Sequence, residues 1–477
     1  MRKLLLSLTI LLTVYGCVSK KEKLSQDDGI ISNQYIVFMT ETFAEPLIKS
    51  IDTTMLVIDT NVTKSLDQKR TKLKDSVQRY FERNGIKIDK NEIFVDVAVG
   101  AVLHITPDMI AKDMLAKLSS DTIRISSVMQ DVKIDINTEI SIRPIQQTDP
   151  GASSDPLKRW LSDPIAQIRP IQQTGGEQAN YDIILDAHGT GLITQAISTA
   201  GGPVTWTSSN HRKIWFLDTG IDSFNTHLNV DFSHGITYVG TSTDDDNGHG
   251  TFCAGIAAGK PVGSENPGLP LIHYGLSEGA PVVPVKVLDK NGQGEMSNVI
   301  LGLDSVAHPG VGNRDDIVNL SLGEYDIGNS YDIRSNKCSA QGIDVVIQNL
   351  ANRLIYVTMA AGNNAGNAKS NLPGCVTGRA DRIFTVSSVN RDLTCAEYAN
   401  FNVTVPPTQP VEFVTIGTRV FSLWDNNQFR MASGTSVSSA LVAGIIHVMN
   451  SKPAFDPHKL IACEGTSTGA KYKLAKH

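Results

Sequence analysis

From about residue 200 onward, short apolar runs alternate with helix-like stretches, and this alternation constrains the fold more than any other feature of the chain. The runs at 213–217, 282–288 and 317–322 are apolar on both faces of a strand. Strands of this kind are typical of parallel sheets, because crossover helices cover both sides of such a sheet. Further strand-like runs occupy 354–360 and 383–389, and helix-like stretches occupy 296–307 and 342–353. Residues 201–477 are therefore expected to form a three-layer α/β/α domain around a mostly parallel sheet.

A smaller unit precedes this domain, over residues 34–137. Its strand-like and helix-like runs follow one another in the order β-α-β-β-α-β, at 34–39, 64–84, 93–99, 101–105, 107–118 and 123–136. That order is typical of the split βαβ, or ferredoxin-like, fold. We therefore expect a small α+β domain ahead of the larger one.

Residues 1–17 have the pattern of an export signal. Arg2 and Lys3 precede an apolar run at 4–15, which is too short to span a bilayer comfortably. Gly16 and Cys17 resemble the cleavage site of bacterial lipoproteins, where the cysteine is acylated. Acylation of Cys17, with 18–33 as a polar tether, and an ordinary secretory signal both stay open. In either case the protein is expected to be exported, as an envelope lipoprotein precursor, an extracellular protein or both.

Residues 138–200 differ from both units in composition. Pro, Gln, Ser, Asp and Gly dominate much of this segment, and the heptapeptide Ile-Arg-Pro-Ile-Gln-Gln-Thr occurs twice, at 142–148 and 168–174. We interpret the repeat as a local duplication in a solvated linker. An exposed connector of this kind is a natural place for proteolytic maturation.

Composition narrows the classes of function. The chain has 43 Lys and Arg against 49 Asp and Glu, so its formal charge is −6. The chain has no concentrated basic stripe, so nothing in its charge suggests a nucleic-acid partner. Apart from Cys17, the cysteines lie at 253, 338, 375, 395 and 463. Export permits disulfides, an odd number leaves at least one thiol unpaired, and four cysteines allow three pairings.

Two short segments each carry a candidate polar side chain close to glycine. Asp218 ends the apolar run at 213–217, and open α/β sheets place their sites at such strand ends. His249 lies between Gly248 and Gly250, ahead of small residues that suit a closely packed helix. Each signal is weak alone, because Asp-Thr-Gly also occurs at ordinary strand ends and a lone His is more often structural than catalytic.

Two later segments follow the same pattern. Ser436 opens another helix of small residues, so its hydroxyl lies at the positive end of a helix dipole. In isolation, a helix-capping Ser explains this segment equally well. Asn363 follows a buried strand and Gly362, where an Asn either makes a turn or directs its amide at a developing oxyanion.

Together, in the order Asp, His, Asn, Ser, these motifs resemble the subtilisin-like serine protease family, peptidase S8, over roughly residues 200–450. Cys253, four residues after His249, is similar to the unpaired thiol of proteinase K-like members. The unit at 34–137 looks like the inhibitor-like propeptide of the family. The resemblance thus implies a subtilisin-like catalytic domain made as a self-processing zymogen.

The resemblance also implies the roles of individual residues. Asp218, His249 and Ser436 would form the catalytic triad, and the Asn363 side chain with the Ser436 backbone N–H would form the oxyanion hole. Two strands would bind extended peptide by β-augmentation, through Gly292, Gln293, Gly294, Ser321, Leu322 and Gly323. No metal or organic cofactor is expected for catalysis. Structural calcium occurs often in the family, and 244–246 offers three carboxylates for it, although such runs are also common in solvated loops.

The expected partners are polypeptide substrates and the chain's own propeptide, acting as an intramolecular inhibitor of a monomeric enzyme. Val437 and the pair Ala440–Leu441 depart from the family, which commonly has Met and then Pro-His there. None of these side chains does proton chemistry, so altered packing is expected. The rival classes are a pseudoprotease, which the complete motif set disfavours, and a serine esterase or acyltransferase. The Asp-first order and the paired substrate strands disfavour the second.

Overall fold

The structure, a computed structural model of the 477-residue chain, describes residues 30–40, 60–96, 98–104, 118–121, 124–136, 183–185, 192–262, 271–324, 342–378, 381–402, 409–463 and 470–477. The predicted signal at 1–17, most of the tether, both copies of the heptapeptide and Cys338 lie outside these ranges. So does the predicted helix at 107–118, apart from its last residue.

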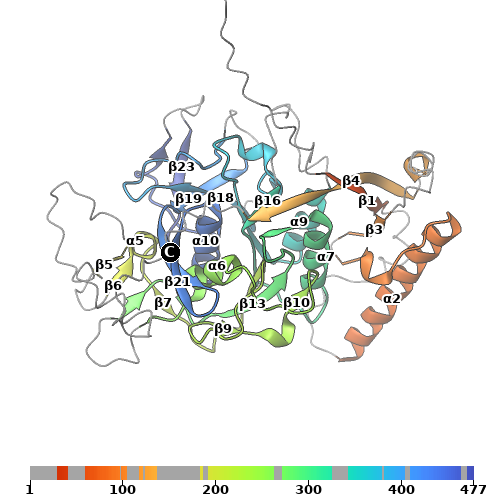
Figure 1. The fold of residues 1–477 in the computed structure, drawn as a ribbon, viewed down its shortest axis with the longest axis horizontal. Helices are drawn as coiled ribbons and strands as arrows, with labels where there is room; N and C mark the ends of the chain where they lie inside the picture. The colour runs from red at the N-terminus through yellow and green to blue at the C-terminus, as the bar shows by residue number, and fades with distance from the viewer. Residues whose placement is uncertain are drawn as a thin grey trace, which may run out of the picture.

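A ten-stranded sheet forms the centre of the larger domain (Figure 1). Its main path is β10 (Ile236–Thr237), β13 (Pro281–Lys286), β8 (Ile214–Asp218), β15 (Ile317–Leu320), β17 (Tyr356–Ala360), β18 (Ile383–Val389), β19 (Val411–Ile416), β23 (Lys471–Leu474) and β22 (Ile461–Ala462), with β9 (Asn229–Val230) beside β13. Neighbours along the path pair in parallel, except β22 with β23. The prediction of a mostly parallel sheet is confirmed.

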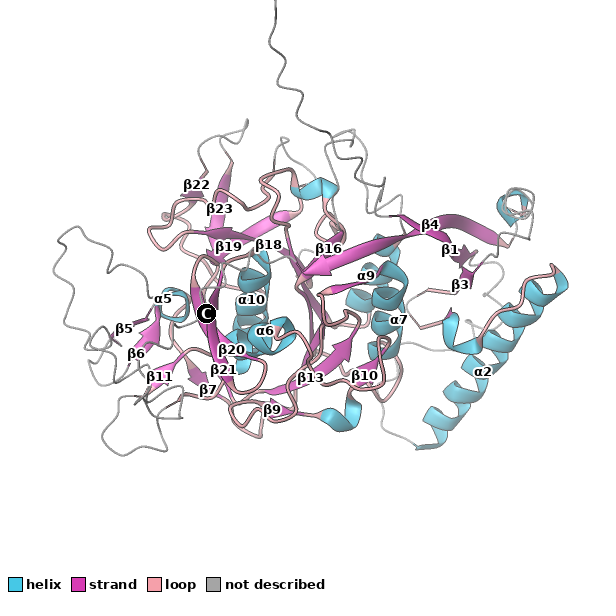
Figure 2. Ribbon diagram, viewed as in Figure 1, coloured by secondary structure: helices cyan, strands magenta, loops and turns pink. Residues whose placement is uncertain are grey.

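Helices cover both faces of this sheet, which completes the predicted three layers. One face carries α6 (His249–Ala258) and α10 (Thr435–Met449), and the other carries α7 (Met296–Val306) and α9 (Ile343–Asn352) (Figure 2). Residues of β8 alternate between the two cores: Ile214 and Phe216 join the core under α6 and α10, whereas Trp215 and Leu217 join the other. This alternation explains why the strand is apolar at every position.

The N-terminal unit is an antiparallel sheet with a helix on one face. Its strands lie in the order β4 (Ile125–Ile136), β1 (Ile30–Met39), β3 (Gly100–His104) and β2 (Ile93–Phe94), and α2 (Thr60–Arg83) and the short helix η1 (Lys90–Glu92) separate β1 from β2. Val37 and Leu103 share a core with Val77 and Phe81 of α2. The described elements thus have the strand order of the predicted ferredoxin-like fold.

The opposite face of this small sheet packs against the larger domain. Ile36, Phe38 and Val102 belong to the same buried cluster as α7 and α9. Gly342, with a φ of +67°, lies so close that a Cβ there would approach the Phe38 ring within 2.8 Å. Because side chains of both units share this cluster, the two units form one continuous packed body. Full burial of each such side chain contributes about 1.5–3 kcal/mol.

Two boundaries differ from the sequence prediction. β1 begins at Ile30, four residues before the predicted strand at 34–39, and so takes up the end of the predicted tether. The strand predicted at 93–99 ends at Phe94, and the prediction is wrong at the described residues 95, 96, 98 and 99. The backbone N–H groups of Val95 and Asp96 donate to the carboxylate of Asp304 on α7 instead of to a neighbouring strand. A side chain from more than 200 residues away therefore ends the strand.

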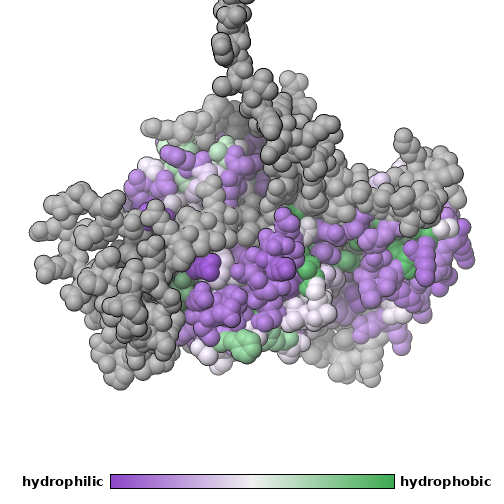
Figure 3. Space-filling view, viewed as in Figure 1, coloured by the Kyte–Doolittle hydropathy of each residue, from purple (hydrophilic) through white to green (hydrophobic). Residues whose placement is uncertain are grey.

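Short elements complete the description. Part of the predicted linker is folded, because β5 (Ile183–Leu185), β6 (Leu192–Thr194) and α5 (Gln195–Thr199) lie within 138–200. The other short elements are β7 (Val204–Thr205), η3 (Phe232–His234), β11 (Ile272–His273), β12 (Ser277–Glu278), β14 (Gln293–Glu295), β16 (Leu322–Glu324), η4 (Ala368–Ser370), β20 (Val420–Trp424) and β21 (Gln428–Ala432). Hydrophilic side chains predominate among the described residues on the face shown in Figure 3. Among the helices that the structure describes, none is both long and apolar enough to cross a bilayer.

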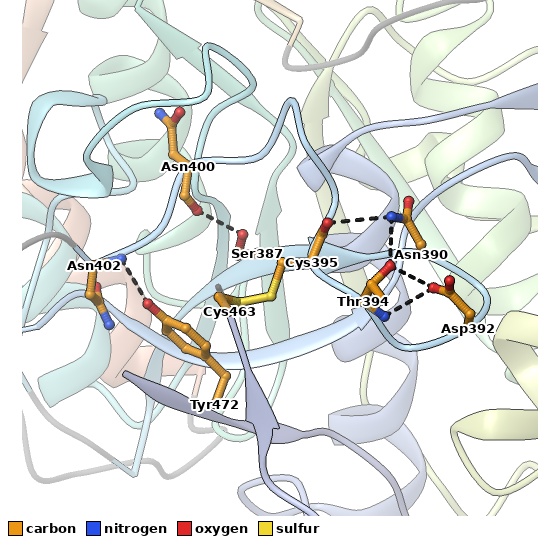
Figure 4. Close-up of a disulfide and its surroundings, with 9 residues drawn as sticks. All are labelled: Ser387, Asn390, Asp392, Thr394, Cys395, Asn400, Asn402, Cys463 and Tyr472. Carbon is orange, nitrogen blue, oxygen red and sulfur yellow. Dashed lines mark hydrogen bonds between the residues drawn. A yellow bond between two sulfur atoms is a disulfide. The ribbon is translucent and has the colours of Figure 1, made fainter. Parts of the chain in front are cut away.

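Among the described cysteines some are disulfide-bonded and one is free, and export permits such disulfides. Cys395 and Cys463 form a disulfide that ties the loop after β18 to the end of β22, with Cα atoms 5.4 Å apart (Figure 4). Cys375 is also disulfide-bonded, whereas Cys253 is free and buried. The prediction of a free thiol at Cys253 is thereby confirmed.

Candidate active site

Asp218 and His249 meet at the carboxyl end of the central strand. Asp218 is the last residue of β8, and His249 is the first residue of α6. The His249 Nδ1–H donates to Asp218 Oδ1 over 2.7 Å, and the backbone N–H of Thr219 donates to the same oxygen over 2.8 Å. Both side chains are fully buried. A carboxylate on Nδ1 fixes the ring orientation and leaves Nε2 as the nitrogen that can take a proton.

The surroundings of His249 make its ring a stronger base. Burial acts to lower the pKa of His249, but the charge and hydrogen bond of Asp218, together with the Cys253 thiol, outweigh burial and leave the pKa well above its ordinary value. The Cys253 sulfur lies 3.8 Å from His249 Nε2. Burial raises the pKa of Cys253, which favours its neutral thiol form.

Ser436 lies one residue inside the N-terminus of α10, as the sequence predicted. Its hydroxyl donates to the backbone carbonyl of Ser321 over 3.0 Å, and the Ser321 hydroxyl donates back to the Ser436 carbonyl over 2.9 Å. The Ser321 side chain is also a hydrogen-bond partner of Cys253, which links this group to His249. Asp218, His249 and Ser436 therefore belong to one buried cluster above the strands β8 and β15.

Asn363 is held beside the same helix terminus. Its side-chain oxygen accepts hydrogen bonds from the backbone N–H and the hydroxyl of Thr435, each over 2.9 Å. These two bonds fix the amide orientation, because the oxygen must face Thr435. The amide nitrogen is buried without a hydrogen-bond partner among the described residues. A buried, oriented donor without a partner is expensive for stability and is what an oxyanion hole requires.

The predicted substrate strands flank a strand of the N-terminal unit. β14 pairs antiparallel with β4 on one side, with Gly294 opposite Ile134, and β16 pairs antiparallel on the other, with Leu322 opposite Ile136. The predicted residues Gln293, Gly294, Leu322 and Gly323 lie on these strands, and Gly292 and Ser321 immediately precede them. A glycine is required at 294, since a Cβ there would approach the Val287 carbonyl within 2.3 Å. The local sequence did not predict that β4 lies between these strands.

Two groups could interact with metal ions. Asp218, His249 and Cys253 each place one ligand atom within 4.8 Å of the others, and this is the group of that kind found among the described residues. A thiophilic ion held there would occupy the proposed base. Within the predicted calcium run at 244–246, Asp245 is buried and Asp246 pairs with Lys286 over 2.6 Å, so calcium binding there stays a prediction.

The fold and this cluster define a class: a three-layer α/β/α protein with a buried Asp–His pair and a serine at a helix N-terminus at the carboxyl end of its parallel sheet. Comparison with known proteins agrees. The model of the subtilase family matches residues 55–471, so the chain belongs to this family. It is a serine-type endopeptidase that acts on polypeptides, as predicted.

Individual relatives are distant. Proteinase T of Parengyodontium album is 28% identical over 278 residues, which cover 57% of this chain and 75% of that protein. Proteinase R of the same fungus is 29% identical over 232 residues, which cover 49% of this chain and 51% of that protein. A cold-adapted subtilisin-like serine proteinase of known structure aligns with a TM-score of 0.45 at 22% identity, over 57% of this chain and 91% of the other.

The two departures from the family pattern lie in the core. Val437, Ala440 and Leu441 are fully buried within the cluster under α10. Ser439 donates to the side-chain oxygen of Asn319 over 2.8 Å. These residues contribute packing and a buried polar contact to the core beneath the site.

Proposed function

We propose that this protein is a self-processing serine endopeptidase whose triad is Asp218, His249 and Ser436. The observation that carries the proposal is the buried 2.7 Å bond between Asp218 and His249, in one cluster with a serine at a helix N-terminus. Asn363 and the Ser436 backbone N–H supply the oxyanion hole. The unpaired amide nitrogen of Asn363 supports that role.

The proposed mechanism gives each of these residues one role. His249 Nε2 takes the proton of the Ser436 hydroxyl as that oxygen attacks the peptide carbonyl. The tetrahedral oxyanion accepts hydrogen bonds from the Asn363 amide and the backbone at 436. His249 then gives its proton to the leaving amine, and the acyl-enzyme is hydrolysed by the reverse sequence. Asp218 stays ionised and stabilises the imidazolium throughout.

We further propose that the protein is made as a zymogen inhibited by its N-terminal unit. β4 takes the place of an extended substrate between β14 and β16, and Ile134 is fully buried there. Leu322, opposite Ile136, is next in sequence to Ser321, whose carbonyl accepts the Ser436 hydroxyl bond. Ile136 is the last described residue of β4, and the predicted propeptide ends one residue later, at 137. Self-cleavage is therefore proposed at Asn137–Thr138, where the predicted propeptide and linker meet.

Export follows from the leader rather than from the folded part. We propose that residues 1–17 direct the precursor out of the cytoplasm, and that acylation at Cys17 would anchor only the N-terminal unit. Cleavage after residue 137 would then release a catalytic fragment of 340 residues, since 477 − 137 = 340. Labelling with palmitate tests this directly: label on the full-length S436A protein and none on the mature fragment supports release.

One experiment tests activity, nucleophile and maturation together. Full-length wild-type and S436A proteins are purified, treated with a fluorophosphonate probe, assayed on casein and sequenced from the N-terminus. We expect the wild type to react with the probe, cleave casein and begin at Thr138, and S436A to stay full length and inactive. Casein cleavage by S436A would refute the triad. An active wild type that begins within 139–175 would leave the triad intact and move the maturation site into the linker.

A further inference from the structure

A buried carboxylate that the proposed mechanism does not use lies between the two segments that carry the base and its orienting acid. Asp245 is 4% exposed. Its Oδ1 accepts hydrogen bonds from the Thr219 hydroxyl at 2.8 Å, the Gly248 N–H at 2.8 Å and the Asn247 N–H at 3.1 Å. Its Oδ2 accepts the backbone N–H and the hydroxyl of Thr251 at 2.9 and 2.6 Å. One side chain thus ties the end of β8 to the first turn of α6.

The two threonines also link these segments to each other. The hydroxyl of Thr219, next to the orienting acid, accepts the backbone N–H of Gly250 over 3.0 Å. The hydroxyl of Thr251, in the first turn of α6, accepts the backbone N–H of Asp222 over 2.9 Å. Each hydroxyl therefore accepts from the other segment and donates to Asp245. Removing the carboxylate would leave both hydroxyls without the acceptor that sets their direction.

The backbone packs closely around this carboxylate, with no space for a side chain at two glycines. A Cβ on Gly250 would lie 2.0 Å from the Gly220 carbonyl oxygen. Gly220 itself has a φ of +110°, and a Cβ there would lie 2.6 and 2.7 Å from the carbonyl oxygens of Thr243 and Asp244. Three chain segments are in direct backbone contact, so a shift of the hydrogen-bonded centre must move the segments against one another.

We infer that Asp245 is a positioning residue for the reaction, which acts through Thr219 and Thr251 to set the distance and angle between Asp218 and His249. The inference rests on the proposed triad. A displacement of about 1 Å at a catalytic group can lower the rate on the order of 10²-fold. Substrate is bound elsewhere, on β14 and β16, so the effect falls on kcat and not on KM.

The test compares Asp245→Asn with Asp244→Asn, its neighbour in the same run. Asn keeps the size of Asp, but its NH₂ group would face a backbone N–H of Thr251 or of Gly248 on either side, and a backbone donor cannot reverse its role. Asp244 accepts one hydrogen bond, from the Ser223 N–H in an exposed loop. The threonine pair Thr251→Ser and Thr251→Val keeps or removes the hydroxyl without changing the charge.

Each variant is purified in the form in which the wild-type protein is active, and kcat is expressed per site titrated with a fluorophosphonate. This normalisation removes losses that are due to misfolding alone. We expect kcat of D245N and T251V to fall roughly 10- to 100-fold with KM within about threefold, and D244N and T251S to stay within about twofold. The acid limb of kcat/KM should shift to lower pH in T251V as well as in D245N, since a loosened Asp218–His249 bond makes the imidazolium more acidic.

The outcomes separate the inference from the proposed function. An inactive wild type, or an active S436A, refutes the triad itself. With an active wild type and inactive S436A, a kcat per titrated site in D245N within threefold of wild type and an unchanged pH profile would overturn the positioning role. T251S as impaired as T251V would overturn it equally, because the retained hydroxyl should restore the link. If D245N does not fold, the comparison of T251S with T251V tests the positioning role instead.

Discussion

Acid should destabilise this protein through one histidine in the core, and the size of the effect can be worked out from its surroundings. His447 lies in the last turn of α10 and is fully buried. Its Nε2–H donates to the Arg212 carbonyl over 3.1 Å, so Nδ1 accepts the Ser277 hydroxyl over 2.7 Å. Burial lowers the pKa of His447 to about 4, with the Arg212 carbonyl bond acting against this shift and the Arg212 charge acting with it.

Because the folded-state pKa lies below the unfolded value of about 6.5, the unfolded chain binds more protons between pH 6.5 and 4. Stability contributed by the neutral ring is complete above pH 6.5 and is lost as the pH falls through this window. Between pH 7 and pH 4 the expected loss from His447 alone is about 3 kcal/mol. For a domain of ordinary stability this is a substantial fraction of the total.

Urea unfolding of the S436A protein, which cannot digest itself under the proposed mechanism, measures this loss at pH 7 and pH 4. His447→Gln should lower the stability at pH 7 and remove about 3 kcal/mol of the pH-dependent loss. His458→Gln serves as the control, because His458 is exposed. If H447Q loses as much stability between pH 7 and pH 4 as its parent, the assignment of acid sensitivity to His447 is wrong.

Three further predictions concern the site and its disulfide. N363A should retain activity above that of S436A but lose about 10²–10³-fold in kcat, measured with a peptide substrate, which is the loss known when subtilisin loses its oxyanion-hole Asn. Mercurials should inhibit the wild type but not C253S, because the Cys253 sulfur lies 3.8 Å from the proposed base; equal inhibition of both would implicate another thiol. Replacing Cys395 and Cys463 by Ser should cost about 4 kcal/mol in the chain-entropy model for a separation of 68 residues, measured by chemical unfolding.

Local pattern predicted most of the larger domain, because its central strands are apolar on both faces. The run at 383–389 is β18 to the residue, and the helices at 296–307 and 342–353 end within one residue of α7 and α9. Such elements are determined by their own sequence. The failure at 93–99 has the opposite cause: Asp304, far away in the chain, accepts the N–H groups that a strand would have used.

In the candidate site, too, local sequence predicts some residues, whereas others are recognised only from contacts with distant parts of the chain. Each motif has a glycine within two residues of its polar residue, so the sequence predicted Asp218, His249, Asn363 and Ser436 as site residues. Asp245 was not, because three consecutive acids look alike in a sequence. Only the fold separates the buried carboxylate from its two neighbours, by placing Thr219 and Thr251 around it.

The position of β4 bears on which step would make the proposed active site accessible to substrate. β4 joins the N-terminal sheet to β14 and β16, so the N-terminal unit and these two strands form one continuous sheet. Cutting the chain at the proposed Asn137–Thr138 bond breaks none of the β4 pairings, and it leaves Phe38 and Ile36 packed against α7 and α9. A cleaved precursor would therefore still be occupied by its own strand. Under the zymogen proposal, the step that exposes the active site is loss of the N-terminal unit, and the stability of that small unit sets its rate.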